Sequence, residues 1–143
     1  MRRPTDVSLP PSLPLLLALT LAPALSMALE PLLDEDTEQL LVDAVTAATE
    51  VDLYHARCRS DVSGRRTDNL NKELASKFRM TVLEVQDDLF PERSYRRAQE
   101  RLQRDFLNKL KEAGGCSGAK ASGMPERLRT RYDELVKEID RLP

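Results

Sequence analysis

Two cysteines, Cys58 and Cys116, carry the most specific chemistry in the sequence, because the chain has only these two thiols. A pair of thiols in an oxidising compartment forms a disulfide, whereas the same pair in a reducing compartment does not. We therefore predict one intramolecular disulfide, with two free buried thiols or an intermolecular bridge as the alternatives. The prediction depends on export of the chain and on a fold that brings the two residues together.

Metal binding and catalysis have few candidate groups. His55, the single histidine, lies three residues before Cys58, so a helix would place both side chains on one face. Two ligands do not complete a zinc site, and no metal site is predicted. Asp87 and Asp88 are adjacent, and on a helix their side chains point about 100° apart. Since no nucleophile, base and orienting group come together, the chain is expected not to be an enzyme and to need no cofactor.

Arginines gather in two places. The first cluster surrounds Cys58 and is a candidate anion-binding site, made of Arg57, Arg59, Arg65 and Arg66. Cations at the C-terminus of a helix also offset the negative end of its dipole, which is the alternative role for this cluster. The second group lies within residues 92–111 and is a candidate partner-binding face, made of Arg93, Arg96, Arg97, Arg101 and Arg104.

Acidic side chains are concentrated in residues 29–56, which contain eight of them and no lysine or arginine. Segregated charges of this kind either pair with one another inside the fold or face different partners. The formal net charge of the full chain is only −2, which provides no bulk attraction toward nucleic acid. The expected partner is therefore another protein, and binding to nucleic acid is not predicted.

A possible apolar patch adds a second partner-binding candidate. Leu83 and Phe90 fall off the main apolar stripe of their segment, and Met80 lies close by in the sequence. Exposed apolar patches on a protein surface often mark partner sites. We therefore include Met80, Leu83 and Phe90 among the candidate partner-binding residues.

Residues 1–28 have the three parts of a secretory signal peptide. Arg2 and Arg3 are positively charged, residues 13–25 are almost entirely apolar, and residues 26–28 place small side chains before the predicted cleavage point. An uncleaved membrane anchor is the alternative, but the apolar run is shorter than the roughly 20 residues that span a bilayer. The mature chain is expected in the periplasm or outside the cell, with no transmembrane span.

The apolar residues after the signal recur at intervals of three and four, which predicts helices. The expected helices cover residues 36–59, 68–89, 91–113 and 125–142. Asp36 and Gln39 have the residue types of a capping box at the first start, and Pro91 and Pro125 suit the first turn of a helix. Residues 117–123 are small and aperiodic, and they predict a loop.

Four amphipathic helices with short connections favour one domain, residues 29–143, folded as an antiparallel up-down bundle. In that order the first and third helices end at the same pole. Cys58 and Cys116 lie at those two ends, so the topology supports the disulfide. The fold class is therefore all-α, a four-helix bundle with one disulfide behind a cleavable signal peptide.

The function expected from these features is that of an exported, non-catalytic helical binding protein. Adaptors, inhibitors, immunity-type proteins and assembly factors all share this size and class. The alternative is a carrier that holds a small apolar ligand in the core of the bundle. A carrier needs an apolar cavity of about 300 Å³ or more, whereas a docking protein needs a filled core and a surface patch.

Overall fold

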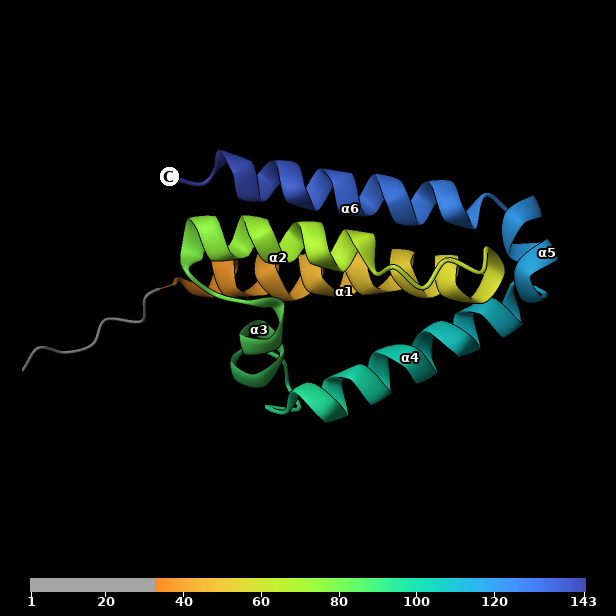
Figure 1. The fold of residues 1–143 in the computed structure, drawn as a ribbon, viewed down its shortest axis with the longest axis horizontal. Coiled ribbons are helices and arrows are strands. Elements are labelled where there is room, and N and C mark those ends of the chain that lie inside the picture. The colour runs from red at the N-terminus through yellow and green to blue at the C-terminus, as the bar shows by residue number, and fades with distance from the viewer. Residues whose placement is uncertain (1–32) are drawn as a thin grey trace, which may run out of the picture. The chain divides into compact units, whose positions relative to one another are not determined.

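The computed structural model describes residues 33–143, so the predicted signal peptide and its cleavage point lie outside the described residues. The described chain is all-helical, without a strand between residues 33 and 143 (Figure 1). Six helices occur in the order α1 (Glu35–Cys58), α2 (Arg65–Phe78), α3 (Val82–Asp88), α4 (Tyr95–Glu112), α5 (Gly115–Ala121) and α6 (Met124–Arg141). None of these six helices is long and apolar enough to cross a membrane.

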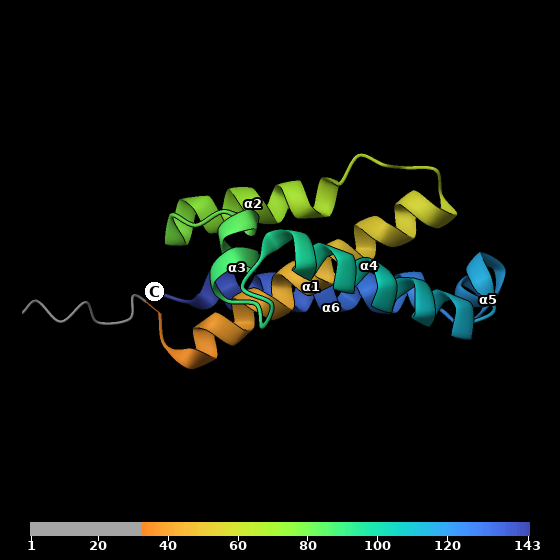
Figure 2. The ribbon, with the colours of Figure 1, turned by 90° about the horizontal axis from the view of Figure 1, so that it is seen from below.

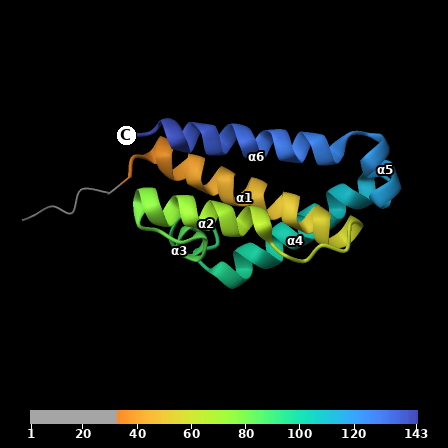
Figure 3. The same ribbon diagram turned by 45° about the horizontal axis from the view of Figure 1, so that its top comes forward.

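Helix α1 is the central element. Figure 3 shows α1 between α2 and α6, and both of these helices pack against it. The buried part of α1 is rich in alanine, which lets neighbouring helices approach closely. Its apolar residues are Leu41, Ala44, Val45, Ala47, Ala48, Val51 and Tyr54. Figure 2 shows that α1 is inclined to α6.

The long helices alternate in direction along the chain. In Figure 1, α1 and α4 run toward α5, whereas α2 and α6 run back in the opposite direction. Helix α4 is inclined to the other long helices, and the short helix α3 packs against both α4 and α1. The C-terminal ends of α1 and α4 therefore lie near α5.

The start of α1 differs from the predicted capping box at Asp36 and Gln39. The helix begins at Glu35, and the N-cap is Asp34, whose carboxylate accepts a 2.7 Å hydrogen bond from the backbone N–H of Thr37. Asp34 satisfies one of the free N–H groups of the first turn, so the helix begins two residues earlier than the box implied.

The helix predicted over residues 68–89 is two helices, so this expectation was wrong. α2 ends at Phe78, and Arg79 then adopts a left-handed conformation with φ of 54°. Helix α3 starts after Thr81, whose hydroxyl accepts from the N–H of Glu84 while the Glu84 carboxylate accepts from the N–H of Thr81. This reciprocal capping box stabilises a new start at Thr81 and stops one helix from continuing through the segment.

The third predicted helix also begins later than expected. Pro91 lies before α4 and not in its first turn, because Ser94 caps the helix by accepting from the N–H of Arg97 and Tyr95 is the first helical residue. Although Tyr95 is spaced to continue the apolar stripe of this helix, it is 43% exposed. The apolar stripe that α4 buries is Ala98, Leu102, Phe106 and Leu110.

Residues 117–123 do not form the predicted loop, because most of them belong to helix α5. A Cβ atom at Gly118 would lie 1.8 Å from the carbonyl oxygen of Ala113, which leaves no room for any side chain there. The small residues thus allow α5 to turn tightly against the end of α4. Gly123 follows with φ of 74° and leads into α6, where Pro125 occupies the first turn as predicted.

The buried residues form a large cluster and a small one. The large cluster joins α1, α2, α3, α4 and α6, and its fully buried members include Leu41, Leu70, Leu74, Phe90 and Ile139. The small cluster consists of Tyr54, Phe106, Leu110 and Ala119, and Cys58 and Cys116 pack against it. This second cluster holds α1, α4 and α5 together around the two cysteines.

One polar side chain lies unpaired in this core. Gln86 of α3 is fully buried, and neither its amide oxygen nor its amide nitrogen has a hydrogen-bond partner within the described residues. A buried amide that gives up water without a replacement bond destabilises the folded state by about 1 to 3 kcal/mol.

The variant Gln86→Met is therefore expected to be more stable than the parent chain. Its free energy of unfolding should be higher by about 1 to 2 kcal/mol. Methionine has a similar length and shape and has no amide to desolvate. Urea denaturation measures the change, and Gln103→Met on the exposed face of α4 serves as control, with an expected change within about 0.5 kcal/mol. A loss of stability in Gln86→Met would show that the amide has a partner in solution.

Candidate functional site

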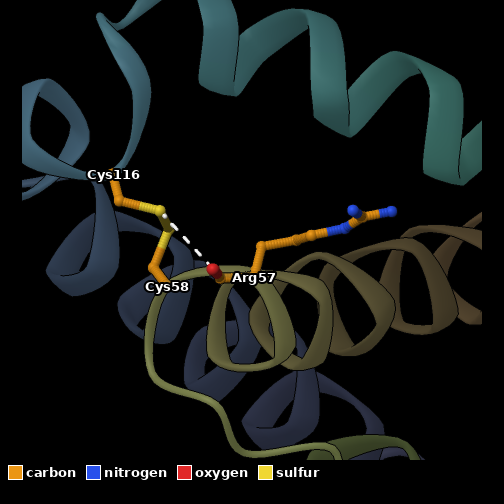
Figure 4. Close-up of a disulfide and its surroundings, with 3 residues drawn as sticks. All are labelled: Arg57, Cys58 and Cys116. Atoms are coloured by element: carbon orange, nitrogen blue, oxygen red, sulfur yellow. Dashed lines mark hydrogen bonds between the residues drawn. A yellow bond between two sulfur atoms is a disulfide. The ribbon is translucent and has the colours of Figure 1, made fainter.

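The disulfide predicted from the sequence is present. Cys58 at the end of α1 is bonded to Cys116 in α5, with 5.4 Å between their Cα atoms (Figure 4). The Sγ atom of Cys116 also lies 3.7 Å from the carbonyl oxygen of Arg57, and this is a close contact since a disulfide sulfur has no proton to donate. We call this end of the helical domain the disulfide pole; it consists of residues 54–66 and 115–129.

A cavity of about 100 Å³ opens at the disulfide pole. Its lining includes four basic side chains and one acidic one, and the residues are Val51, Tyr54, His55, Arg59, Arg66, Pro125, Glu126, Leu128 and Arg129. Three separate elements supply them, namely the end of α1, the start of α2 and the start of α6. The cavity is therefore a product of the tertiary fold, because these segments are far apart in the sequence.

Two further hollows adjoin this cavity. One, of about 240 Å³, contains the disulfide itself together with Tyr54, Arg59 and Lys120. The other, of about 70 Å³, is lined by His55, Asp61, Arg65 and Arg66. Arg59 and Arg66 each line two of the three hollows, so they are the central cations of the pole.

Several contacts hold Arg66 in place. The carboxylate of Asp52 on α1 accepts hydrogen bonds from the backbone N–H groups of Arg66, at 3.0 Å, and of Thr67, at 2.8 Å. Asp52 thereby caps α2 from another helix, since the Gly64 cap has no side chain to do so. The hydroxyl of Tyr132 donates to the carbonyl oxygen of Arg66 at 3.3 Å. Burial raises the pKa of the Tyr132 phenol, and the positive charge of Arg66 partly opposes that rise.

Aromatic rings orient the two central guanidinium groups. The guanidinium carbon of Arg59 lies 5.7 Å from the centre of the Tyr54 ring, and that of Arg66 lies 5.7 Å from the centre of the Tyr132 ring. Contacts of this type stabilise a cation and keep its planar group in a defined direction. Both arginines therefore present ordered N–H donors at the pole.

The structure divides the predicted anion-binding cluster. Arg59 and Arg66 line the same cavity, while Arg65 lines only the adjoining hollow. The side chain of Arg57 extends away from the disulfide in Figure 4 and lines none of the three hollows. Sequence reasoning missed Arg129, although its place one turn after Pro125 put it at the pole where the last helix begins.

Most arginines of the second group have partners within the chain. Arg93 donates to the carbonyl oxygen of Asp88, and Arg97 donates to that of Glu92 at 3.0 Å. Arg101 forms a salt bridge with Glu92 and a 3.5 Å pair with Asp105, which Arg104 also approaches at 3.6 Å. The hydrogen bond from Arg101 lowers the pKa of Glu92. Arg93, Arg97 and Arg101 contact the segment before α4 and secure the start of that helix, whereas Arg96 remains exposed.

Acidic side chains of residues 29–56 also form contacts within the molecule. Asp34 caps α1, Asp52 caps α2, and Glu50 is buried where it pairs with Lys109 of α4 and Arg131 of α6. The charge segregation seen in the sequence thus largely reflects a central acidic helix whose carboxylates join neighbouring helices.

The predicted apolar patch of Met80, Leu83 and Phe90 does not exist as one surface. Phe90 is fully buried, with the guanidinium carbon of Arg101 5.8 Å from the centre of its ring, so its assignment to an exposed patch was wrong. Leu83 is 47% exposed, and Met80 lines a different feature, a groove of about 540 Å³. We call it the apolar groove; it is lined by Leu33, Phe78, Met80 and Leu89, with Glu38, Lys77, Arg79 and Asp88 beside them.

Comparison with known proteins identifies no protein that is similar to this chain. No family model, curated protein or solved structure matches the chain.

The groups considered for catalysis or metal binding have other roles in the structure. The Asp87 carboxylate accepts a hydrogen bond from the N–H of Tyr95 and so helps to start α4, whereas Asp88 lies at the apolar groove. Cys58 is in the disulfide and is unavailable to join His55 as a metal ligand. Between residues 33 and 143 no three potential ligands come close enough together to hold a metal ion.

Proposed function

We propose that this chain is an exported, non-catalytic helical protein that acts by binding another protein. In this proposal residues 1–28 direct export and are removed, and the four longer helices act as an antiparallel bundle in the periplasm or outside the cell. The disulfide supports this location, since such bonds persist mainly in oxidising compartments.

The apolar groove is the observation that carries the proposal. Four partly buried apolar side chains from the start of α1, the end of α2 and the segments flanking α3 meet there, namely Leu33, Phe78, Met80 and Leu89. Beneath them, the space between α1, α2 and α6 is filled by fully buried side chains such as Leu41, Leu74 and Ile139. A filled core below an apolar surface groove is the combination expected of a docking protein.

The edges of the groove also resemble those of a protein interface. Lys77 and Arg79 supply positive charges there, and Glu38 and Asp88 supply negative ones. An apolar centre with a polar, mixed-charge rim is typical of surfaces that bind and release partners. One large apolar side chain of the partner, inserted against Phe78 and Met80, would supply much of the binding energy.

A second candidate function is favoured by the size of the same groove. Its volume of about 540 Å³ falls within the range of sites that hold small molecules, roughly 300 to 1,000 Å³. A carrier would therefore bind its apolar ligand at this surface and not in the core of the bundle, where packed side chains occupy the space.

The test compares two charge-introducing variants of the mature, oxidised protein. Met80→Asp places a carboxylate in the apolar groove, whereas the control Leu83→Asp places one at an exposed position that does not line the groove. Each variant is used to capture proteins from the native extracytoplasmic fraction. We expect a protein retained by the parent chain and by Leu83→Asp, and at least tenfold less of it on Met80→Asp.

Circular dichroism of both variants checks that the fold is kept. Native mass spectrometry of the purified parent chain separates the two candidate functions, because a carrier would retain a small apolar ligand. A ligand present in the parent and lost in Met80→Asp, without a captured protein, would overturn the docking proposal in favour of the carrier. Equal capture by all three proteins would overturn the role of the groove.

A further inference from the structure

The cavity at the disulfide pole carries an inference separate from the apolar groove. Three arginines and a histidine line it, while Glu126 is the one carboxylate in the lining. No salt bridge joins Arg59, Arg66 or Arg129 to a carboxylate in residues 33–143, unlike the arginines at the start of α4. A hollow at which positive side chains outnumber the one carboxylate, and at which no salt bridge engages the arginines, attracts anions.

Two of the three guanidinium groups, those of Arg59 and Arg66, are held against aromatic rings. Tyr54 and Tyr132 lie against Arg59 and Arg66, and the start of α2 is fixed by Asp52. The Nε atom of Arg66 is buried, yet it has no hydrogen-bond acceptor in the described part of the chain. A buried guanidinium N–H without an acceptor is unfavourable, and an oxygen atom of a bound ligand would satisfy it.

The dimensions limit the ligand to a small group. The cavity, of about 100 Å³, is smaller than the roughly 300 Å³ at which sites for drug-sized molecules begin. Guanidinium groups bind the oxygens of carboxylates and phosphates through pairs of parallel N–H donors. Both kinds of oxyanion group are small enough for the space and match the donors that line it.

We propose that this cavity is a binding site for an oxyanion, a phosphate or a carboxylate group, held by Arg59, Arg66 and Arg129. Arg66 contributes its buried Nε–H, and the more exposed Arg59 and Arg129 close on the anion from the end of α1 and from α6. The disulfide contributes by fixing the end of α1, which carries Arg59, against α5. Binding forms charge-assisted hydrogen bonds and breaks no covalent bond.

The test uses the intact oxidised protein and inorganic phosphate or acetate as probes. The variant Arg59→Gln/Arg129→Gln removes two lining cations, whereas the control Arg57→Gln/Arg127→Gln removes the same charge from positions that do not line the cavity. Isothermal titration calorimetry measures the affinities, and the NMR signal of the Arg66 Nε–H group reports contact at the cavity. The probe that binds more tightly identifies the preferred oxyanion.

We expect the lining variant to weaken binding of that probe at least tenfold and the control variant to change it less than twofold. The Arg66 Nε–H signal should shift on addition of the probe to the parent chain. If binding weakens equally in both variants, the overall positive charge and not the cavity attracts the probe, and the proposal is overturned. It is also overturned if the parent chain binds neither probe. Met80→Asp should bind the oxyanion normally, so failure of the apolar groove and failure of this site are distinguishable.

Discussion

The double variant Cys58→Ala/Cys116→Ala is expected to have a free energy of unfolding about 4 kcal/mol lower than that of the oxidised parent chain. The disulfide joins residues 58 positions apart, and a cross-link restricts the unfolded chain more as the closed loop grows longer. The loss is a large share of the 5 to 15 kcal/mol that is typical of a folded domain. Urea denaturation monitored by circular dichroism gives the value.

Replacing both cysteines avoids a free thiol that would form intermolecular bridges. The control is the parent chain in the presence of a reductant, which should unfold at the same urea concentration as the double variant. If the double variant and the oxidised parent unfold together, the bond contributes no stability, and packing of Tyr54, Phe106 and Ala119 alone holds the pole.

The parts of the fold that the sequence predicted well are those set by local pattern. Helix α1 was expected over residues 36–59 and covers Glu35–Cys58, because its apolar spacing continues unbroken to the cysteine. Helix α6 was expected from Pro125, which is in its first turn. The disulfide was predicted from the alternating directions of the helices. That prediction holds even where the predicted helix boundaries are wrong by several residues.

The sequence predictions failed where a local signal competed with the apolar stripe. The stripe runs through residues 70–89 without interruption, but Thr81 and Glu84 have the spacing of a capping box and begin a new helix. This signal was present in the sequence and went unused. The helix α5 had no comparable signal, because small residues usually indicate a loop, and only contact with Ala113 explains why Gly118 is required.

The candidate sites were predictable to different extents. Arg59 and Arg66 were identified because they lie within eight residues of Cys58, which the topology placed at a pole, whereas Arg129 belongs to a helix more than 60 residues further along the chain. The apolar groove combines Leu33 with the last residue of α2 and residues beyond it, so no periodicity within one segment indicates it. Phe90 was misassigned because a residue after the last turn of a helix need not follow its stripe, and here it folds back into the core.

Glu50 shows why the acidic character of α1 is structural. Its side chain is only 5% exposed, and its carboxylate pairs with Lys109 and, at 3.5 Å, with Arg131. The two cations are in contrast about half exposed, at 52% and 45%. Each cation reaches water even without its partner, whereas the carboxylate depends on them. The three residues join α1, α4 and α6.

This difference in exposure predicts that removing the two cations, Lys109 and Arg131, destabilises the protein more than removing Glu50 does. The variant Lys109→Met/Arg131→Met leaves a buried carboxylate without a partner and is expected to lose about 3 to 5 kcal/mol. Glu50→Met instead removes the buried charge and leaves two cations that solvent can hydrate, so we expect a loss below about 1.5 kcal/mol. Urea denaturation at pH 7 compares both variants with the parent chain.

The triple variant Glu50→Met/Lys109→Met/Arg131→Met completes the comparison. Because it contains no buried charge to desolvate, it should be more stable than Lys109→Met/Arg131→Met by at least about 2 kcal/mol. Such a recovery would show that the unpaired carboxylate of Glu50, and not the lost packing of the long lysine and arginine side chains, destabilises Lys109→Met/Arg131→Met. If the triple variant is as unstable as the double variant, the cost arises from packing, and Glu50 does not need its cations.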